Sequence, residues 1–182
     1  MNFNKHYDLK DKHSFLSPSS YAWLRYSDDK LIERYYSSQA MEQGTRLHSL
    51  AAQLIEEGIR LPKNRNSFNA YVNDAIGFKM TPEVALYYSK NCFGHADTIS
   101  FKKDFLRIHD YKSGVTPASM DQLYIYDALF CLEYSINPFD ISGELRIYQF
   151  DEINSVNHDP NITKDIMERI VSFDKIIESL KE

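Results

Sequence analysis

The feature that most constrains the fold is a succession of three short runs rich in β-branched and aromatic residues. These runs are Glu83–Ser89, Phe93–Ser100 and Phe105–Tyr111. Residues of these types favour extended strands. The second and third runs are joined by Lys102-Lys103-Asp104, a short polar connection that suits a hairpin. We therefore predict three consecutive strands, of which the last two form a β-hairpin.

Helical periodicity flanks these strands on both sides. It is strongest over Ser38–Gly58, where apolar residues recur at spacings of three and four and Gly58 supplies a stop. The segment Leu16–Ser20 predicts a turn feeding a helix, with Ser17 or Ser19 as N-cap. The other predicted elements are helices over 68–79, Ser119–Tyr134 and Asn161–Leu180, and a strand over Gly143–Phe150.

This order of elements is helices, three strands, helix, strand, helix. It predicts one α/β domain over residues 1–182, with a mixed β-sheet flanked by helices. Hydrophobic residues make up 43% of the chain, and 13 Tyr, 11 Phe and 1 Trp supply bulky material for a core. The sequence contains no run of about 18 apolar residues, so it predicts no transmembrane helix. The polar N-terminus lacks a signal peptide's apolar region, so we expect a cytoplasmic protein.

The net charge of −5 argues mildly against a nucleic-acid partner, because such proteins are usually basic. The charge is unevenly distributed, however. Residues 1–65 carry a balance of +2 and residues 66–182 a balance of −7. Several of the later acids fall in the candidate site described next, where a bound cation would offset them.

The residues that carry chemistry lie on the predicted hairpin. Asp97 stands near the end of one strand, and Asp110 and Lys112 lie two apart on the next, so their side chains share a face. If the two strands pair, Asp97 falls beside Asp110. Two carboxylates and one ammonium then meet, although an isolated Asp-x-Lys is usually an ordinary strand pair.

Phosphodiester hydrolysis needs this set of groups. Carboxylates hold Mg²⁺ or Mn²⁺ through oxygen, and the metal polarises the phosphoryl group and activates water. A lysine beside that water orients or deprotonates it and helps to neutralise charge on the phosphate. The predicted hairpin therefore indicates a hydrolytic metal site.

Three features of the flanking segments strengthen this interpretation. His48 stands four residues after Gly44 on a predicted helix, and imidazole is a good ligand for Mn²⁺-type ions; a histidine bonded to a backbone carbonyl is the alternative. Gln122 and Tyr126 share a helix face and could reach a phosphate or order the lysine, or merely form that face. Glu83 is a candidate water-mediated ligand, although a structural role is the favoured interpretation.

In this order, the motifs resemble the RecB-like branch of the PD-(D/E)XK nuclease superfamily, from about residue 15 to residue 135. The resemblance implies a restriction-endonuclease-like core with a central mixed sheet flanked by helices. The matching segments are Ser17-Pro18-Ser19, Gly44-x-x-x-His48, Gly94-His95-Ala96-Asp97, Asp110-Tyr111-Lys112-Ser113-Gly114 and Gln122-x-x-x-Tyr126.

The resemblance also implies roles for individual residues. Asp97, Asp110 and Lys112 would be catalytic. The ligands of Mg²⁺ or Mn²⁺ would be His48, Asp97, Asp110 and the backbone carbonyl of Tyr111. Gln122 and Tyr126 would support the substrate, and the charge of Arg46 makes it a further expected phosphate contact.

The chain departs from this branch in two respects. Some members carry four cysteines that bind an iron–sulfur cluster, whereas this chain has only Cys92 and Cys131. We therefore expect no iron–sulfur cluster. The sequence also shows no helicase segment and no Walker A motif, so we expect a stand-alone nuclease core similar in size to phage exonucleases.

These observations predict a metal-dependent deoxyribonuclease. An exonuclease is favoured over a structure-selective endonuclease, and a non-catalytic DNA-binding or partner-recruiting module on the same fold is the remaining alternative. The expected partners are DNA and a recombination or replication protein, with no membrane, in a bacterial or phage-infected cell. The oligomeric state stays open.

Overall fold

The computed structural model describes residues 14–181, which divide between two compact units on either side of the boundary between Thr45 and Arg46. Helix α1 (Asp28–Glu56) begins in the first unit and ends in the second. The first unit also contains the 3-10 helix η2 (Pro18–Arg25). There the Trp23 indole N–H donates to the Ser17 carbonyl at 3.0 Å, and Phe15 packs edge-on against Tyr35. Each unit is described by itself.

The N-terminal helices differ in part from the prediction. Ser17 precedes η2 as its N-cap, but its side chain makes no capping hydrogen bond. Helix α1 begins at Asp28, well before the predicted start at Ser38. Asp28 and Asp29 lie in its first turn. Acidic side chains are favourable there because the helix dipole is positive at its N-terminus.

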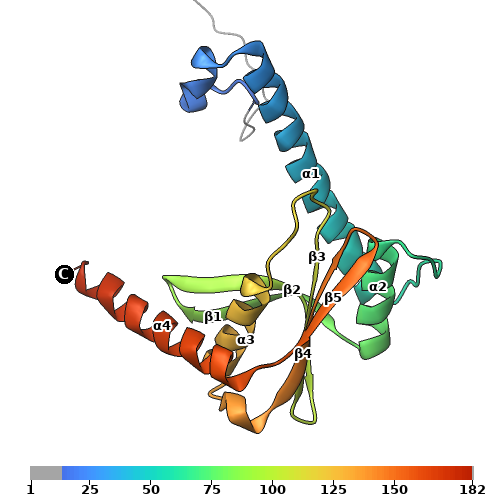
Figure 1. Cartoon of the computed structure of the whole chain (residues 1–182), viewed down its shortest axis with the longest axis vertical. Helices are drawn as coiled ribbons and strands as arrows, with labels where there is room; N and C mark the ends of the chain where they lie inside the picture. Colours follow the sequence, from blue (N-terminus) through green and yellow to red (C-terminus); the bar gives the residue numbers. More distant parts are fainter. Residues whose placement is uncertain (1–13, 182) are drawn as a thin grey trace, which may run out of the picture. The chain divides into compact units, whose positions relative to one another are not determined.

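The second unit is built on a five-stranded sheet in the order β1-β2-β3-β4-β5 (Figure 1). Neighbouring strands are antiparallel except β3 and β4, which are parallel. The expected mixed sheet flanked by helices is therefore confirmed. The strands are β1 (Thr81–Ser89), β2 (Cys92–Lys102), β3 (Phe105–Tyr111), β4 (Ser142–Gln149) and β5 (Glu152–Asn157).

Strand β5 was not predicted. Phe150 and Asp151 form the turn of the hairpin between β4 and β5, and Glu152 begins β5. Both turn residues have positive φ, 55° and 57°. Two-residue hairpin turns of this kind usually carry Asn-Gly or Asp-Gly, a signal that is absent here. The strand lies at the sheet edge and is mostly exposed, so it also lacks a hydrophobic alternation.

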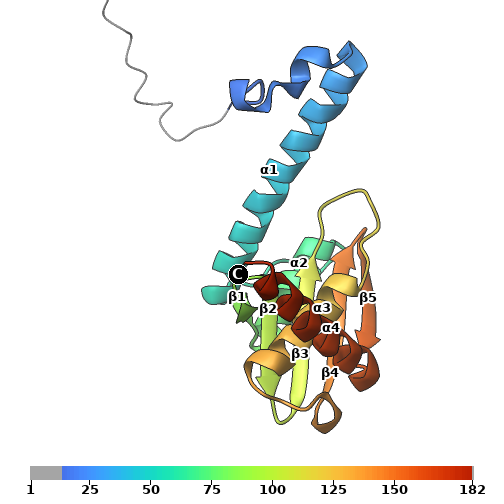
Figure 2. The ribbon, with the colours of Figure 1, turned by 90° about the vertical axis from the view of Figure 1, so that its left-hand side faces the viewer.

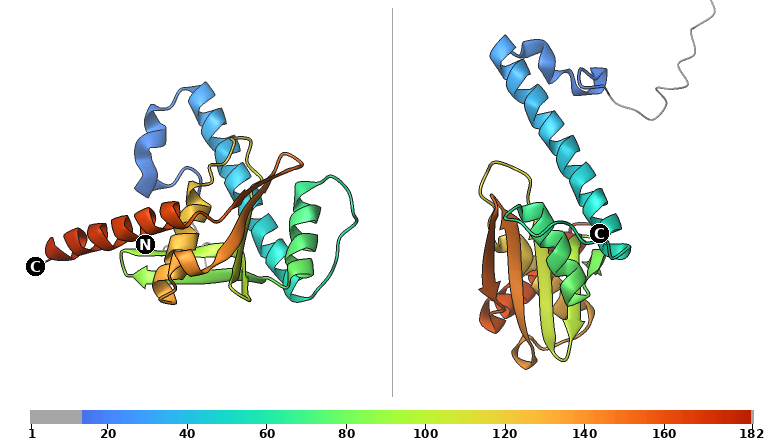
Figure 3. Two further views of the ribbon diagram at one scale, coloured as in Figure 1. Left: turned by 60° about the horizontal axis from the view of Figure 1, so that its bottom comes forward. Right: turned by 90° about the vertical axis from the view of Figure 1, so that its right-hand side faces the viewer.

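Helices cover both faces of this sheet. Helices α3 (Asp121–Glu133) and α4 (Pro160–Ser179) lie on one face, and α2 (Ser67–Phe78) lies on the other (Figures 2 and 3). None of these helices, nor any other in the described part of the chain, is long and apolar enough to cross a membrane. The α3 side is filled by Leu106, Ile108, Leu123, Leu129, Leu145 and Ile147. The α2 side is filled by Ala51, Ile55, Tyr71, Val72, Ala75, Tyr111 and Tyr148.

A buried ion pair joins α3 to the segment that enters α4. His158 Nδ1 lies 2.6 Å from an Asp127 carboxylate oxygen, and its Nε2 lies 2.8 Å from the Pro138 carbonyl in the short helix η3 (Pro138–Asp140). Both neighbours are acceptors, so both ring nitrogens must carry hydrogen. Burial lowers the pKa of His158, but the hydrogen bond to Asp127 and its charge outweigh burial and raise the pKa. The ring is therefore held as an imidazolium.

We predict that His158→Gln destabilises the fold by roughly 3–5 kcal/mol at pH 6, because it leaves the Asp127 charge buried without compensation. The stabilisation is present below the ordinary histidine pKa of about 6.5 and is lost as pH rises through the raised pKa of the folded protein. Urea unfolding from pH 6 to pH 9 measures the difference between wild type and variant. A difference that does not shrink with pH would contradict the ion pair.

Candidate active site

The candidate site lies where strands β2 and β3 separate. Their pairing ends with Thr98 opposite His109. Two residues after His109, the Tyr111 backbone N–H donates to the side chain of Asp97 on β2, at 3.0 Å from Oδ2, and not to a backbone carbonyl of that strand. Continuing the register by one residue sets Asp97 opposite Asp110. At this point the Asp97 carboxylate therefore takes the place of a backbone carbonyl as the acceptor for the Tyr111 N–H.

Three potential metal ligands meet beside this opening. His48 on α1, Glu83 on β1 and Asp97 on β2 each offer one atom, and these atoms all lie within 4.8 Å of one another. His48 Nδ1 is 3.2 Å from Asp97 Oδ2, and this hydrogen bond raises the pKa of His48. Burial, followed by the charge of Asp97, raises the pKa of Glu83. One imidazole and two carboxylates form a donor set that suits a divalent cation.

Glu83 takes a more central place than its sequence indicated. It was expected to be a structural residue or a water-mediated ligand. The pairs Pro82 with Thr98 and Val84 with Ala96 bracket it, and its φ of +51° departs from the extended backbone around it. A positive φ is uncommon for a residue other than glycine. Its carboxylate belongs to the same group of potential ligands as the His48 imidazole and the Asp97 carboxylate.

Asp110 is buried next to this group, with 1% of its surface exposed. The Lys112 ammonium lies 3.0 Å from each of its two oxygens, but only Oδ1 accepts a hydrogen bond. Among the described residues Oδ2 has no hydrogen-bond partner. Burial, followed by the charge of Asp97, raises the pKa of Asp110 to about 6. The charge of this carboxylate is therefore only partly compensated by Lys112.

A chain of hydrogen bonds links Lys112 to helix α3. Its ammonium donates to Gln122 Oε1 at 2.9 Å, and Gln122 Nε2 donates to the Tyr126 hydroxyl at 3.2 Å. The Tyr126 ring lies over Gly94 of β2, where an added Cβ would meet ring atom Cε1 at 2.9 Å. The strand motif around Gly94 and the helix motif Gln122-x-x-x-Tyr126 are thus in contact.

The remaining expected site residues have simpler placements. The N–H of Tyr111 is bound to Asp97, and its ring packs on Tyr71 and Phe68 with centroids 5.9 and 5.3 Å away. Its backbone carbonyl remains an expected ligand. Arg46 is an exposed residue of α1, two positions before His48. The cysteines are both free thiols on different elements, β2 and α3.

Gln149 supports the site and was missed by the sequence analysis, which gave only a strand over Gly143–Phe150. Its Nε2 donates to the carbonyls of Gly114 and Thr116 at 2.7 and 2.8 Å, and its Oε1 accepts from the Ala118 N–H at 3.0 Å. This one side chain pins the loop between Lys112 and α3. Its partners are more than 30 residues away in sequence, so no local pattern could reveal them.

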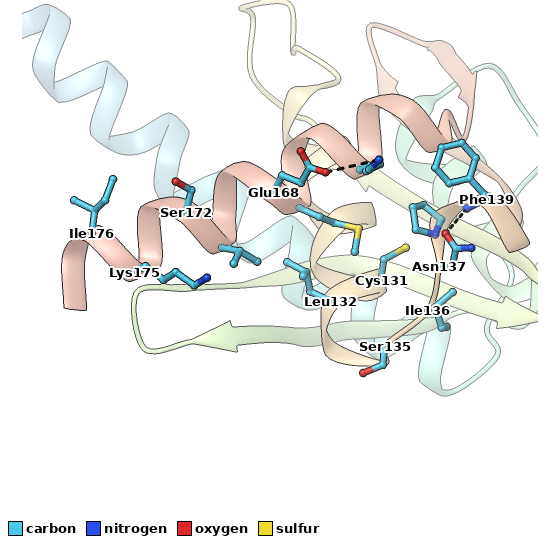
Figure 4. Close-up of a pocket in the computed structure, with 14 residues that line it drawn as sticks. Cys131, Leu132, Ser135, Ile136, Asn137, Phe139, Glu168, Ser172, Lys175 and Ile176 are labelled. Atoms are coloured by element: carbon cyan, nitrogen blue, oxygen red, sulfur yellow. Dashed lines mark hydrogen bonds and ion pairs between the residues drawn. The ribbon is translucent and has the colours of Figure 1, made fainter. Parts of the chain in front are cut away.

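A larger cavity lies away from these groups. It measures about 1,040 Å³ and is bounded by the end of α3, η3 and α4 (Figure 4). Much of its lining is apolar, including Leu132, Ile136 and Ile176, and it contains none of the groups described above. The chemistry therefore does not centre on this cavity.

A search of protein-family models and a search of curated proteins each returned no match to this chain.

We predict that Gly94→Ala displaces the Tyr126 ring and destabilises the protein by about 1–3 kcal/mol, the usual cost of overpacking. Gly114→Ala is the matched control, because a Cβ there meets nothing within 4 Å. Urea unfolding measures both variants. Placing Gly94→Ala in a Tyr126→Ala background should remove most of the cost. An unchanged cost in that background would mean that Gly94 does not act through Tyr126.

Proposed function

We propose that this chain is a metal-dependent deoxyribonuclease of PD-(D/E)XK type, related to the RecB-like exonucleases. One observation carries the proposal. Buried Asp110 holds Lys112 on one oxygen, leaves the other without a hydrogen bond among the described residues, and lies next to the acidic group that contains Asp97. The motif order Asp97, Asp110, Lys112 supports the same family. DNA is the expected substrate, inside a bacterial or phage-infected cell, and a recombination or replication protein is the expected partner.

The residues present fit a Mg²⁺ or Mn²⁺ ion. Such ions take oxygen ligands, and Mn²⁺ also accepts imidazole. His48, Glu83, Asp97 and Asp110 would hold the ion, with the Tyr111 carbonyl as a further expected ligand. Burial, followed by repulsion from the charge of Asp97, raises the pKa values of Glu83 and Asp110. A divalent cation would offset that repulsion.

When bound, the cation would polarise the phosphodiester and favour attack by water. Besides the cation, Lys112 supplies a positive charge from the chain itself. Its ammonium has three N–H groups, and Asp110 and Gln122 take two of them. The third can donate to a phosphate oxygen or orient the attacking water. The Tyr126 hydroxyl accepts from Gln122, so its own proton can be directed to the substrate.

An exonuclease is the favoured form of this activity. Phosphate contacts from Lys112, Gln122 and Tyr126 would position DNA without reading its sequence. Such a site admits an unpaired strand more easily than an intact duplex, which favours DNA ends. The non-catalytic alternative is disfavoured because a binding module has no need to retain Asp97, Asp110 and Lys112 together.

We predict that Lys112→Met lowers the cleavage rate of linear DNA by roughly 10²–10³-fold, the usual loss when a transition-state donor is removed. Binding of Mn²⁺, measured by calorimetry, should persist in Lys112→Met and weaken strongly in Asp110→Asn. Lys103→Met is the matched control, because Lys103 is exposed in the β2–β3 turn. If Lys112→Met cleaved DNA at the wild-type rate, Lys112 would have no catalytic role, and its pair with Asp110 would be an ordinary strand contact.

The choice of exonuclease predicts that linear DNA is degraded progressively in Mg²⁺ or Mn²⁺ while covalently closed circles persist. Both forms are incubated in one tube with the wild-type protein and followed on a gel. Lys112→Met serves as the control for contaminating nuclease. Rapid linearisation of the circle would instead indicate an endonuclease, and binding of both forms without cleavage would indicate the non-catalytic module.

A further inference from the structure

A second, smaller cavity of about 220 Å³ adjoins Lys112. Its walls come from three segments that are far apart in sequence: the start of α2 at Asn66–Phe68, the loop at Tyr111–Val115, and the β4–β5 turn at Phe150–Asp151. None of the acids that would hold the cation lines it. Its volume is below the roughly 300–1,000 Å³ of sites for drug-sized ligands, so it suits a group no larger than a single base.

One polar group of this cavity, the Ser67 hydroxyl, lacks a hydrogen-bond partner among the described residues. Ser67 is 6% exposed, and its hydroxyl oxygen has no hydrogen bond within the part of the chain that the structure describes. Its backbone N–H donates to Asp151 Oδ1 at 3.0 Å, which places the Asp151 carboxylate at the start of α2. Buried hydroxyls are nearly always hydrogen-bonded in native proteins. An unpartnered one that lines a cavity indicates a ligand.

Aromatic side chains supply another part of the lining. Phe150 is 55% exposed at the hairpin turn, where its φ is +55°. This backbone conformation is costly for a bulky residue. Phe68 and Tyr111, in edge-on contact with each other, line the inner part. Flat apolar rings with a hydroxyl and a carboxylate match the flat face and polar edge of a nucleobase.

We propose that this base pocket, lined by Ser67, Tyr111, Phe150 and Asp151, receives one unpaired nucleobase of the strand being cleaved and selects bases with an exocyclic amine. The inference rests on the proposed nuclease function, because Lys112 links the base pocket to the phosphate. The Asp151 carboxylate accepts from the amine, as acidic side chains do with the amino group of cytosine. Thymine would turn a carbonyl oxygen toward the same carboxylate and be disfavoured.

The charge of Asp151 argues against a phosphate as the occupant. The N-terminus of α2 would otherwise attract an anion, but Asp151 already takes the Ser67 N–H, and Asn66 takes the Asn69 N–H. A second negative group would meet the carboxylate directly. The opposite wall is fixed in advance, because Gln149 pins the loop through Gly114 and Thr116. The pocket is therefore preformed for a neutral ligand.

The test compares thymine with 5-methylcytosine, which differ only in the groups at positions 3 and 4 of the ring. Forked linear duplexes carry one or the other base throughout their unpaired arms, so that pairing strength does not differ. We expect wild-type kcat/KM in Mn²⁺ to be roughly tenfold higher for the 5-methylcytosine arms. Phe150→Ala should raise KM for both substrates.

Two variants assign the preference to the pocket. Asp151→Asn keeps an oxygen for the Ser67 N–H but can also present an amide donor, so the preference should shrink or reverse toward thymine. Ser67→Ala should reduce the preference while leaving the backbone hydrogen bond intact. Asp104→Asn is the matched control, because Asp104 occupies the same kind of left-handed turn position in the β2–β3 hairpin, with φ +58°. It should retain the wild-type preference.

The outcomes separate the two proposals. Equal cleavage of both duplexes would overturn the base pocket and leave the nuclease standing. A preference that Asp151→Asn does not change would also overturn it. Cleavage that depends on a terminal phosphate with no base preference would assign the cavity to phosphate instead. No cleavage of either duplex would overturn the nuclease proposal, and the base pocket with it.

Discussion

The hydrogen bond from the Tyr111 backbone N–H to the Asp97 carboxylate is the interaction on which the candidate site depends. It takes the place of a ladder hydrogen bond between β2 and β3, so the two strands part without leaving this buried donor unpaired. The Asp97 side chain is thereby fixed beside His48 and Glu83. The same separation leaves Asp110 facing this group from the neighbouring strand.

Electrostatics then determine what the site can hold. Asp110 is almost fully buried and Lys112 compensates it only in part, which raises its pKa to about 6. Strongly perturbed acids of this type cluster at functional sites. Lys112 is in turn oriented through Gln122 and Tyr126 on α3, and the buried pair of Asp127 and His158 anchors that helix. The core of the second unit therefore positions the proposed catalytic lysine.

Much of the fold could be predicted because its signals are local. Runs of strand-forming residues and local helical or strand patterns predicted α2, α3, α4 and four of the five strands, and the short polar connection predicted the β2–β3 hairpin. Strand β5 escaped because an exposed edge strand has no apolar alternation and its turn, Phe150-Asp151, has no glycine or asparagine. The early start of α1 escaped because exposed apolar residues and charges alternate there without a clear helical stripe.

The sequence by itself determined which chemical groups are available: Asp97, Asp110 and Lys112 at hairpin spacing, with a histidine and a Gln-x-x-x-Tyr pair on flanking helices. Only the tertiary structure decided how they are grouped. It joined Glu83 to His48 and Asp97, and it connected Lys112 to Gln122 on α3. It also brought Ser67 and Asp151 together across 84 residues of sequence. Such contacts depend on sheet register and helix docking, and no local pattern encodes the distance between side chains on different elements.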